Sequence, residues 1–331
     1  MSRVVSPRSF FYSASVGIVA WAAMIVPLPF LEYIPGRPTE VPPLIALESA
    51  DVTELDGTTA LLTVSLRQQS TLGALMAAVD ADRSLYRLEQ IYPPDLDRDE
   101  YRQLQRERFS RQFEIAAAVG ARAAGIPTEL VTEVVVVDVV DNGASSGLLT
   151  PGDVVVTVDG MPVTAAEELQ QAVLQRQVGD TVDLEIVRDG QSIRRVVTLG
   201  SLAGQDGPRL GVAIQTAVDE LRLPFKITLA EPTRIGGPSA GLIVGVTVYD
   251  LLASEDLLRG RTVAATGSLD ADGSVGHVGG VPEKMRAAAA FGADVVLVPY
   301  GQADIAKQAA PGVNIIGVRN LDEAINALRT H

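Results

Sequence analysis

Residues 266–288 read TGSLDADGSVGHVGGVPEKMRAA, and they carry the strongest structural signals in the chain. The pair Gly279-Gly280, followed by Pro282, predicts that a helix begins at about residue 282. Lys284 then lies in the first helical turn, where a positive charge is unfavourable beside the positive end of the helix dipole. A lysine placed there either reaches solvent or has a function, and its unfavourable position indicates function.

The middle of this segment, DADG at residues 270–273, predicts a tight turn. We expect it to join a strand at 262–269 to a strand at 274–278 in a hairpin. The turn lacks the later ligands of a calcium-binding loop, so we predict no metal site. His277 follows the turn and His331 ends the sequence, and two histidines make an imidazole-rich metal site unlikely to form.

A second glycine-rich segment, GGPSAG, lies at residues 236–241. Gly237 allows a sharp backbone turn, and Ser239 and Ala240 then lie at the start of an apolar helix expected at 239–253. Free N–H groups at a helix start can hold an oxyanion, so Ser239 is a candidate nucleophile. The alternative is a serine that only caps the helix after a Gly-Pro turn.

The same letters satisfy G-x-S-x-G, the nucleophile elbow of α/β-hydrolases, which suggests a Ser–His esterase. That mechanism needs a histidine well after the serine in the sequence. His277 follows Ser239 too closely for this role, and His331 is the last residue. The mechanism also needs more sheet before the serine than this segment provides. The esterase is therefore disfavoured.

Composition excludes several classes of function. The 331 residues are 47% hydrophobic and 21% charged, which predicts a globular protein of about two domains. The net charge of −14 argues against a nucleic-acid partner, and the lack of cysteine excludes disulfides and thiolate chemistry. None of the three lysines, Lys226, Lys284 and Lys307, follows a glycine, so the chain has no Walker A motif and we expect no ATP. We expect no cofactor of any kind.

The N-terminal region predicts a membrane anchor. Residues 9–31 carry no charge, with Arg3 and Arg8 before them and Glu32 after them. A helix over residues 10–26 would rise about 25 Å, the short end of a membrane span. A cleaved signal peptide is the main alternative, and a buried core helix is a weaker one. The arginines place the N-terminus in the cytoplasm and the bulk of the chain outside it.

The run GLLTPGDVVVTVDGMPV, residues 147–163, resembles the core of a PDZ domain of the bacterial protease type. Around it we expect strands at 133–140, 181–188 and 193–199 and a helix at 164–177. The resemblance implies a groove beside that helix, where a peptide adds as an extra strand. No clear Gly-hydrophobic-Gly-hydrophobic loop precedes the strand at 133–140, which leaves capture of a C-terminal carboxylate open.

From residue 205 the pattern alternates strands and helices, which predicts an α/β or α+β domain. The expected strands are 209–217, 225–231, 262–267, 294–298 and 314–318. The expected helices are 239–253, 282–291, 301–310 and 321–330.

Together GGPSAG, residues 266–288 and GADVVLVP (292–299) resemble the proteolytic domain of Lon-type serine proteases, in the same order and at similar spacing. The resemblance implies that Ser239 is the nucleophile and Lys284 the general base. It implies that Thr266 supports the lysine, with Gly237 and Ala240 as supporting backbone positions. The chain departs from the family in having Gly236-Gly237 where Asp-Gly is frequent, and in lacking the ATPase module.

The expected organisation is a multidomain α+β and α/β protein that resembles the membrane-bound, PDZ-containing Lon-like proteases of bacteria. Residues 1–40 form a cytoplasmic tip, a transmembrane helix and a linker. Residues 41–204 form a PDZ-like domain, with its core at about 125–200, a first strand at 58–66 and a helical insertion at 71–124. Residues 205–331 form the Lon-like domain.

We therefore expect an ATP-independent serine endopeptidase with a Ser239–Lys284 dyad that acts on protein or peptide substrates. Lysine must be neutral to act as a base, so Lys284 should be buried without a carboxylate partner, with Glu283 pointing elsewhere. The rival is a catalytically inactive peptide-binding scaffold at the membrane. Lon-like domains commonly form rings, so a homo-oligomer is compatible with this interpretation.

Overall fold

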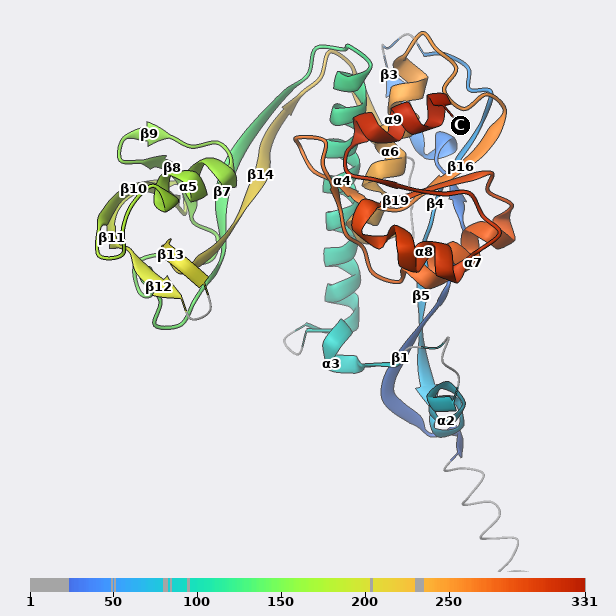
Figure 1. Ribbon diagram of the computed structural model, residues 1–331, viewed down its shortest axis with the longest axis horizontal. Helices are drawn as coiled ribbons and strands as arrows, with labels where there is room; N and C mark the ends of the chain where they lie inside the picture. The colour runs from blue at the N-terminus through green and yellow to red at the C-terminus, as the bar shows by residue number, and fades with distance from the viewer. Residues whose placement is uncertain are drawn as a thin grey trace, which may run out of the picture. The chain divides into compact units, whose positions relative to one another are not determined.

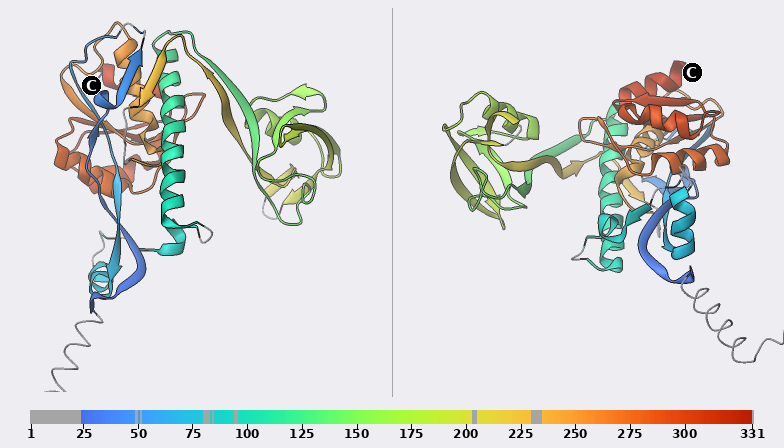
Figure 2. Two further views of the ribbon diagram at one scale, coloured as in Figure 1. Left: turned by 180° about the vertical axis from the view of Figure 1, so that it is seen from behind. Right: turned by 60° about the horizontal axis from the view of Figure 1, so that its bottom comes forward.

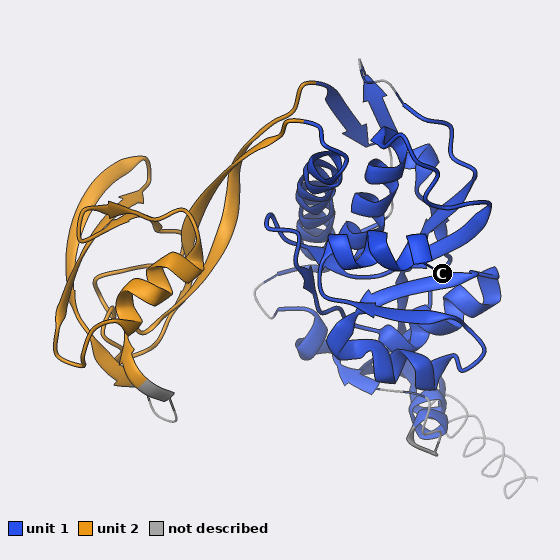
Figure 3. Cartoon of the chain, turned by 45° about the horizontal axis from the view of Figure 1, so that its top comes forward, with its two compact units in different colours: residues 1–126, 225–331 blue, residues 127–224 orange. Residues whose placement is uncertain are grey.

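The computed structural model describes residues 24–330, except 49, 51, 80–82, 84, 94–95, 203–204 and 230–234. The chain divides into two compact units (Figure 3). Unit 1 combines residues 1–126 with residues 225–331, and unit 2 is formed by residues 127–224. Unit 2 is therefore an insertion within the sequence of unit 1.

The predicted anchor at residues 10–26 lies outside the described residues, apart from its last three positions. Within the part of the chain that the structure does describe, none of the helices has the length and apolar character needed to span a membrane.

A five-stranded sheet forms the centre of unit 1, in the order β2-β4-β16-β19-β20 (Figure 1). Four of these strands are parallel, and β2 joins the edge in the antiparallel direction. The strands are β2 (Thr39–Glu40), β4 (Gly57–Leu61), β16 (Arg261–Ala265), β19 (Val295–Pro299) and β20 (Ile315–Val318). Every residue of β19 is buried, as expected of an apolar run in a parallel sheet covered on both faces.

Helices cover both faces of this sheet. Helices α7 (Val281–Phe291) and α8 (Ala303–Ala309) pack on one face, where Met285 and Val296 belong to the same buried cluster. Helix α6 (Gly241–Leu252) packs on the other face, and its Thr247 hydroxyl lies 2.7 Å from the Thr59 hydroxyl of β4. Helices α4 (Arg98–Ala123) and α9 (Leu321–Thr330) pack in turn against α6.

The crossing of α4 and α6 depends on two glycines. A Cβ added at Gly120 of α4 would lie 2.4 Å from the carbonyl oxygen of Gly245 of α6. Only a residue without a side chain allows this approach. The long α4, drawn in teal in Figures 1 and 2, is thereby fixed along the protease-like part of unit 1.

Shorter elements complete unit 1. A three-stranded antiparallel sheet has the order β5-β1-β6, and β3 pairs with β15. These strands are β1 (Pro27–Pro35), β3 (Ile45–Glu48), β5 (Val64–Ser70), β6 (Leu85–Arg87) and β15 (Lys226–Leu229). The short helices are η1 (Pro42–Leu44), α2 (Thr71–Val79), α3 (Leu88–Ile91), η2 (Pro238–Ala240) and η3 (Tyr300–Gln302).

The hairpin predicted around DADG is present, but its first strand is shorter than expected. Strands β17 (Ser268–Leu269) and β18 (Val275–Gly276) are antiparallel, and the turn is closed by a hydrogen bond from the Asp270 amide to the Ser274 carbonyl, 2.9 Å. The preceding residues 261–265 belong to β16 of the central sheet. The four helices expected after residue 238 are present as α6, α7, α8 and α9.

The assignment of residues 58–66 to the PDZ-like domain is wrong, and so is the insertion of residues 71–124 there. Residues 57–61 form β4, which is parallel to β16 in the central sheet of unit 1, and residues 64–70 form β5 in another sheet of the same unit. The buried edge of β16 requires a partner strand for its backbone groups, and β4 provides it from the N-terminal region. Helix α4 likewise belongs to unit 1.

Unit 2 is a small β domain with one helix. Its main sheet has the order β11-β10-β8-β7-β14. The elements are β7 (Glu129–Val139), β8 (Val154–Val158), β9 (Met161–Pro162), α5 (Ala166–Leu174), β10 (Thr181–Arg188), β11 (Gln191–Thr198), β12 (Gly200–Leu202), β13 (Gln205–Arg209) and β14 (Val212–Arg222). Its core is aliphatic, with Val134, Leu184 and Ile186 fully buried.

The Pro-Gly-Asp turn of unit 2 is stabilised from inside. Gly152 has a φ of +93°, which favours glycine, and Asp153 behind it is buried. Burial raises the pKa of the Asp153 carboxyl, but hydrogen bonds from Arg188 and from the Thr150 amide outweigh that effect, so its pKa is lowered. The motif therefore encodes a turn held by a buried ion pair.

The predicted start of the Lon-like domain at residue 205 is also wrong. The strand expected at 209–217 is observed as β14, but it pairs along its length with β7 and completes the sheet of unit 2. The chain returns to unit 1 at residue 225.

Candidate functional site

Ser239 lies in the turn that begins helix α6. Gly237 has a φ of +84°, Pro238 opens the short helix η2, and α6 continues from Gly241. The Gly237 amide donates a hydrogen bond to the carbonyl of Gln105 in α4, 2.8 Å, and Ala240 is buried. The glycine-rich segment therefore holds Ser239 at a fixed position, half-buried at a helix start.

The backbone of Ser239 is tied to the segment that follows β16. Its carbonyl accepts hydrogen bonds from the Gly267 amide, 2.9 Å, and from the Thr266 hydroxyl, 3.4 Å. The Leu242 amide donates back to the Gly267 carbonyl, 3.0 Å. Thr266 and Ser239 are thus adjacent, although 26 residues of sequence separate them in the interval 240–265.

Lys284 lies in the first turns of α7, as predicted. Gly280 precedes the helix with a φ of +67°, and the Lys284 amide donates to the Gly280 carbonyl, 3.0 Å. The side chain is 3% exposed, and its Nζ donates a hydrogen bond to the Thr266 hydroxyl, 3.0 Å. Burial lowers the pKa of Lys284 to about 8. The predicted contact between Lys284 and Thr266 is present, and Lys284 is buried as predicted.

Glu283 does not neutralise Lys284. Its carboxylate lies 3.6 Å from the guanidinium of Arg286, one turn further along α7. This arrangement is the one expected for neighbouring residues that project from different sides of a helix. The amine of Lys284 therefore has a hydroxyl as its hydrogen-bond partner rather than a carboxylate.

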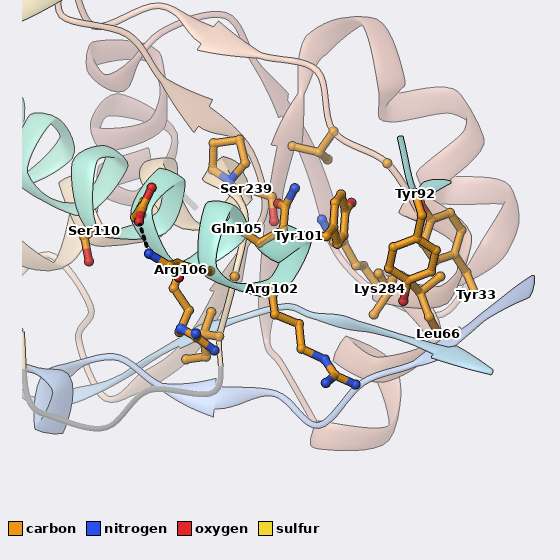
Figure 4. Close-up of a pocket in the computed structure, with 18 of the residues that line it drawn as sticks. Tyr33, Leu66, Tyr92, Tyr101, Arg102, Gln105, Arg106, Ser110, Ser239 and Lys284 are labelled. Atoms are coloured by element: carbon orange, nitrogen blue, oxygen red, sulfur yellow. Dashed lines mark hydrogen bonds between the residues drawn. The ribbon is translucent and has the colours of Figure 1, made fainter. Parts of the chain in front are cut away.

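Ser239 and Lys284 line one cavity of about 1480 Å³ within unit 1 (Figure 4). Among the described residues no hydrogen bond joins the Ser239 hydroxyl to the Lys284 amine, whose observed hydrogen-bond partner is the Thr266 hydroxyl. Thr266 contacts both residues and connects them. Catalytic hydrogen bonds are frequently loose in an unliganded enzyme, so this spacing is compatible with a base that acts after substrate binds.

His277 also lines this cavity, but it does not support the esterase interpretation. Its ring packs against Gly301, where an added Cβ would lie 2.6 Å from Nε2. Within the described part of the chain it has no hydrogen bond to Ser239 and no carboxylate that orients it. The Ser–His–Asp mechanism needs a carboxylate that orients the imidazole, and this missing group weighs against the esterase.

Helix α4 supplies one wall of the cavity, which the sequence interpretation missed. Tyr101, Arg102, Gln105 and Arg106 project from one side of its N-terminal half (Figure 4). Sequence reasoning treated this helix as a solvated face because its charges are mixed. The small residues of its second half, AAAVGARAAG at 116–125, signal close helix packing and could have placed it.

The antiparallel pair of strands β1 and β5 supplies a second, apolar wall. Tyr33 comes from β1 and Leu66 from β5, and both lie with Tyr92 at the Lys284 end of the cavity (Figure 4). Burial raises the pKa of Tyr33, which keeps this phenol neutral. Neither strand was expected near the site, because both pair only over long sequence separations.

In unit 2, β14 is an edge strand of the sheet and lies beside α5. The Ala166 amide at the start of α5 donates to the Thr216 hydroxyl of β14, 2.9 Å. A Leu210-Gly211 loop precedes the strand, and Gly211 has a φ of +73°. A glycine turn thus lies directly in front of β14, at the end of unit 2.

A cluster of metal-ligating side chains is absent from the described part of the chain. Asp270 and Asp272 serve the hairpin turn, where the Asp272 carboxylate accepts a hydrogen bond from the Ser274 amide, 2.8 Å. The geometry of the cavity instead supports nucleophilic acyl transfer, with a serine at a helix start and a buried amine that loses its proton easily.

Comparison with known families assigns a different family to each of two parts of the chain. Residues 230–330 match the Lon protease (S16) C-terminal proteolytic domain, and residues 105–199 match the PDZ domain. The chain therefore carries a PDZ domain and a Lon-type C-terminal proteolytic domain. The PDZ match begins within α4, whereas the compact unit runs from 127 to 224.

Curated relatives resemble one domain or the other. Lon protease 2 of Bacillus subtilis is 32% identical over 94 residues, which are 28% of this chain and 17% of that protein. Lon protease of Rickettsia felis is 34% identical over 93 residues, 27% of this chain and 12% of that protein. A probable periplasmic serine endoprotease, DegP-like, of Pseudomonas savastanoi is 26% identical over 120 residues, 36% and 25% of the two chains. The matched part thus spans a quarter or less of each relative.

Two solved structures each match about a quarter of the chain. The PDZ domain of the SdrC-like protein from Listeria monocytogenes is 22% identical, with a TM-score of 0.24, and covers 24% of this chain and 85% of that one. The Geobacillus thermodenitrificans protein GtR34C is 28% identical, with a TM-score of 0.23, and covers 24% and 94%.

Proposed function

We propose that this chain is an ATP-independent serine endopeptidase of the Lon type, with Ser239 as nucleophile and Lys284 as general base. The observation that carries the proposal is the buried amine of Lys284, held by Thr266 beside Ser239 in one cavity. With a pKa of about 8, about one amine in ten is neutral at pH 7, against fewer than one in a thousand for a free lysine.

In the first half of the reaction, neutral Lys284 takes the proton of the Ser239 hydroxyl. The Oγ then attacks the carbonyl carbon of a peptide bond, and the oxyanion is stabilised by backbone N–H groups of the turn that holds Ser239, at the start of η2. The tetrahedral intermediate collapses when the Lys284 ammonium gives its proton to the leaving amine. This step breaks the C–N bond and leaves an ester on Ser239.

In the second half, Lys284 is neutral again and deprotonates a water molecule. The hydroxide attacks the ester, the C–O bond to Ser239 breaks, and the proton returns to the serine oxygen. Thr266 is a positioning residue in both halves, because it holds the amine and the Ser239 carbonyl at once. No nucleotide enters this chemistry.

Unit 2 would supply substrate recognition. A free edge strand with a helix beside it is the geometry that binds an extended peptide as an additional strand. The Leu210-Gly211 turn at the start of β14 lies where a carboxylate-binding loop would be needed. We propose that β14 and α5 capture protein or peptide substrates and deliver them to the cavity.

We also propose that residues 10–26 anchor the chain in the cell membrane, with the bulk of the chain outside the cytoplasm. The support is the uncharged run after Arg3 and Arg8, and one relative, which matches 36% of this chain, is named periplasmic. Protease added to intact spheroplasts should degrade the described residues. Full protection would contradict this orientation, and recovery in the soluble fraction would favour a cleaved signal peptide.

A catalytically inactive peptide-binding scaffold is the alternative function. It is favoured by one observation, the missing hydrogen bond between Ser239 and Lys284. One experiment distinguishes the endopeptidase from the scaffold. Purified full-length chain in detergent is incubated with an unfolded protein, with and without ATP, and the release of fragments is measured. An endopeptidase cleaves equally in both conditions and is silenced by Ser239→Ala, whereas a scaffold releases no fragments.

A further inference from the structure

Helix α2 has an apolar surface that faces outward. Its residues Thr71–Val79 include no charged side chain. Leu72, Leu75 and Met76 are spaced to lie on one side of the helix, and they are 48%, 66% and 56% exposed. The opposite side packs inward through Ala77, which is 4% exposed. A helix of a water-exposed surface normally has the reverse arrangement.

The chain that leads into β1 continues this surface. Met24, Ile25 and Val26 are 50%, 55% and 49% exposed. The Thr71 amide at the start of α2 donates a hydrogen bond to the Val26 carbonyl, 3.3 Å, and Pro27 pairs with Ser70. Both views in Figure 2 place α2 beside the start of β1. We call these six exposed residues, 24–26 with 72, 75 and 76, the α2 patch.

We propose that the α2 patch lies in the interface of the lipid bilayer, where Leu72, Leu75 and Met76 of α2 extend the membrane contact made by the end of the anchor at residues 24–26. This inference rests on the proposed anchor, because the uncharged residues 9–23 lead directly into Met24. An apolar helix face of this kind is suited to the boundary between headgroups and acyl chains. A second protein copy fits less well, because stable protein interfaces bury about 20–30 residues on each side.

The consequence concerns the substrates that can reach Ser239. Strand β1 runs from the patch to Tyr33, which lines the cavity, over about 20 Å at the rise of a β-strand. Its partner β5 leads from the patch to Leu66 in the same cavity wall. The patch therefore holds the cavity close to the membrane surface, where segments of membrane proteins just outside the bilayer are the accessible polypeptides.

The chain offers its own probes for a test. It has no cysteine and a single tryptophan, Trp21, in the predicted anchor. Full-length chain carrying Leu75→Cys is labelled with an environment-sensitive dye and inserted at low protein-to-lipid ratio into vesicles containing brominated lipid. The matched control is Ile305→Cys in α8, where the parent side chain is 48% exposed. If the Leu75→Cys variant fails to fold, Leu72→Cys repeats the measurement.

The dye at residue 75 should be quenched severalfold more than the dye at residue 305, with Trp21 also quenched. Quenching of Trp21 without the dye at residue 75 overturns the patch and leaves the anchor intact. If neither Trp21 nor the dye at residue 75 is quenched, the anchor and the patch are both overturned. A further outcome is that the dye at residue 75 reports an apolar environment only at a high protein-to-lipid ratio, or in detergent without lipid. That result identifies a protein surface, and not lipid, as what covers the patch, and it also overturns the proposal.

Discussion

At the scale of the residue, burial of Lys284 destabilises the folded protein when the amine is charged, but it also lowers the pKa of the amine so that it can act as a base. Its ammonium is removed from water and receives one hydroxyl contact, from Thr266. Burial lowers its pKa to about 8, whereas an unfolded chain has a lysine pKa of about 10.4. The folded protein therefore binds this proton less tightly than the unfolded chain does, and the free energy of unfolding depends on pH.

The sign of that dependence gives a prediction. Between pH 8 and pH 10 the unfolded state holds the extra proton, so the stability of the wild type rises with pH through this window. Lys284→Met keeps an unbranched side chain that is one heavy atom shorter, and it removes the proton. The variant should be more stable than the wild type at pH 7, and its advantage should shrink by about 1 kcal/mol by pH 9. Urea unfolding at the two pH values measures this, and a constant difference would contradict a buried, titrating amine.

At the scale of the element, α4 positions the site although it carries neither member of the dyad. It contacts the Ser239 turn through Gln105 and crosses α6 at Gly120. Helix propensity alone predicts that Gly120→Ala stabilises the helix by about 1 kcal/mol. The contact of 2.4 Å between the added Cβ and the Gly245 carbonyl works in the opposite direction, and overpacking typically costs about 1–3 kcal/mol.

We therefore expect Gly120→Ala to lower the melting temperature and to reduce peptide cleavage, because a displaced α4 moves the cavity wall. Gly312→Ala is the matched control, since an added Cβ there meets no atom within 4 Å. Thermal unfolding and kcat/KM on a short peptide measure both effects. A stabilised Gly120→Ala variant with full activity would show that the helices do not cross as closely as described.

The sequence predicted the elements that carry local signals. The Gly280 turn, helix α7 and the contact of Thr266 with Lys284 were expected and are present. The partners that arrive from distant sequence were not predicted. Strand β4 is short and pairs with β16, whose partner residues follow about three-fifths of the chain later, as Gly57 and Arg261 show. The sequence of β4 alone does not distinguish it from the first strand of a PDZ-like sheet. The same holds for β14, whose partner β7 decides its domain.

At the scale of the whole molecule, the insertion of unit 2 makes it removable. Glu129 and Arg222 are paired at the base of the β7–β14 ribbon, with their side chains 3.1 Å apart, so the ends of unit 2 are adjacent. A short Gly-Ser linker can therefore replace residues 129–222 without stretching unit 1. Each unit has its own hydrophobic core, which supports independent folding.

This excision should leave cleavage of a short fluorogenic peptide nearly unchanged and reduce cleavage of a tagged or partly folded protein by at least about tenfold, since delivery would depend on β14. Circular dichroism of the excised chain checks that unit 1 remains folded. Equal loss on both substrates in a folded variant would remove the delivery role from unit 2.

The central claim is that Lys284 acts as the base for Ser239, and the kcat/KM of Lys284→Arg against pH tests it most directly. Arginine keeps the positive charge but cannot release its proton at any working pH, so it separates a base from a charge that only anchors structure. We predict that wild-type activity rises with pH through about 8, that Lys284→Arg is inactive throughout, and that His277→Ala remains active. Substantial activity in Lys284→Arg, or its loss in His277→Ala alone, would contradict the Ser239–Lys284 mechanism.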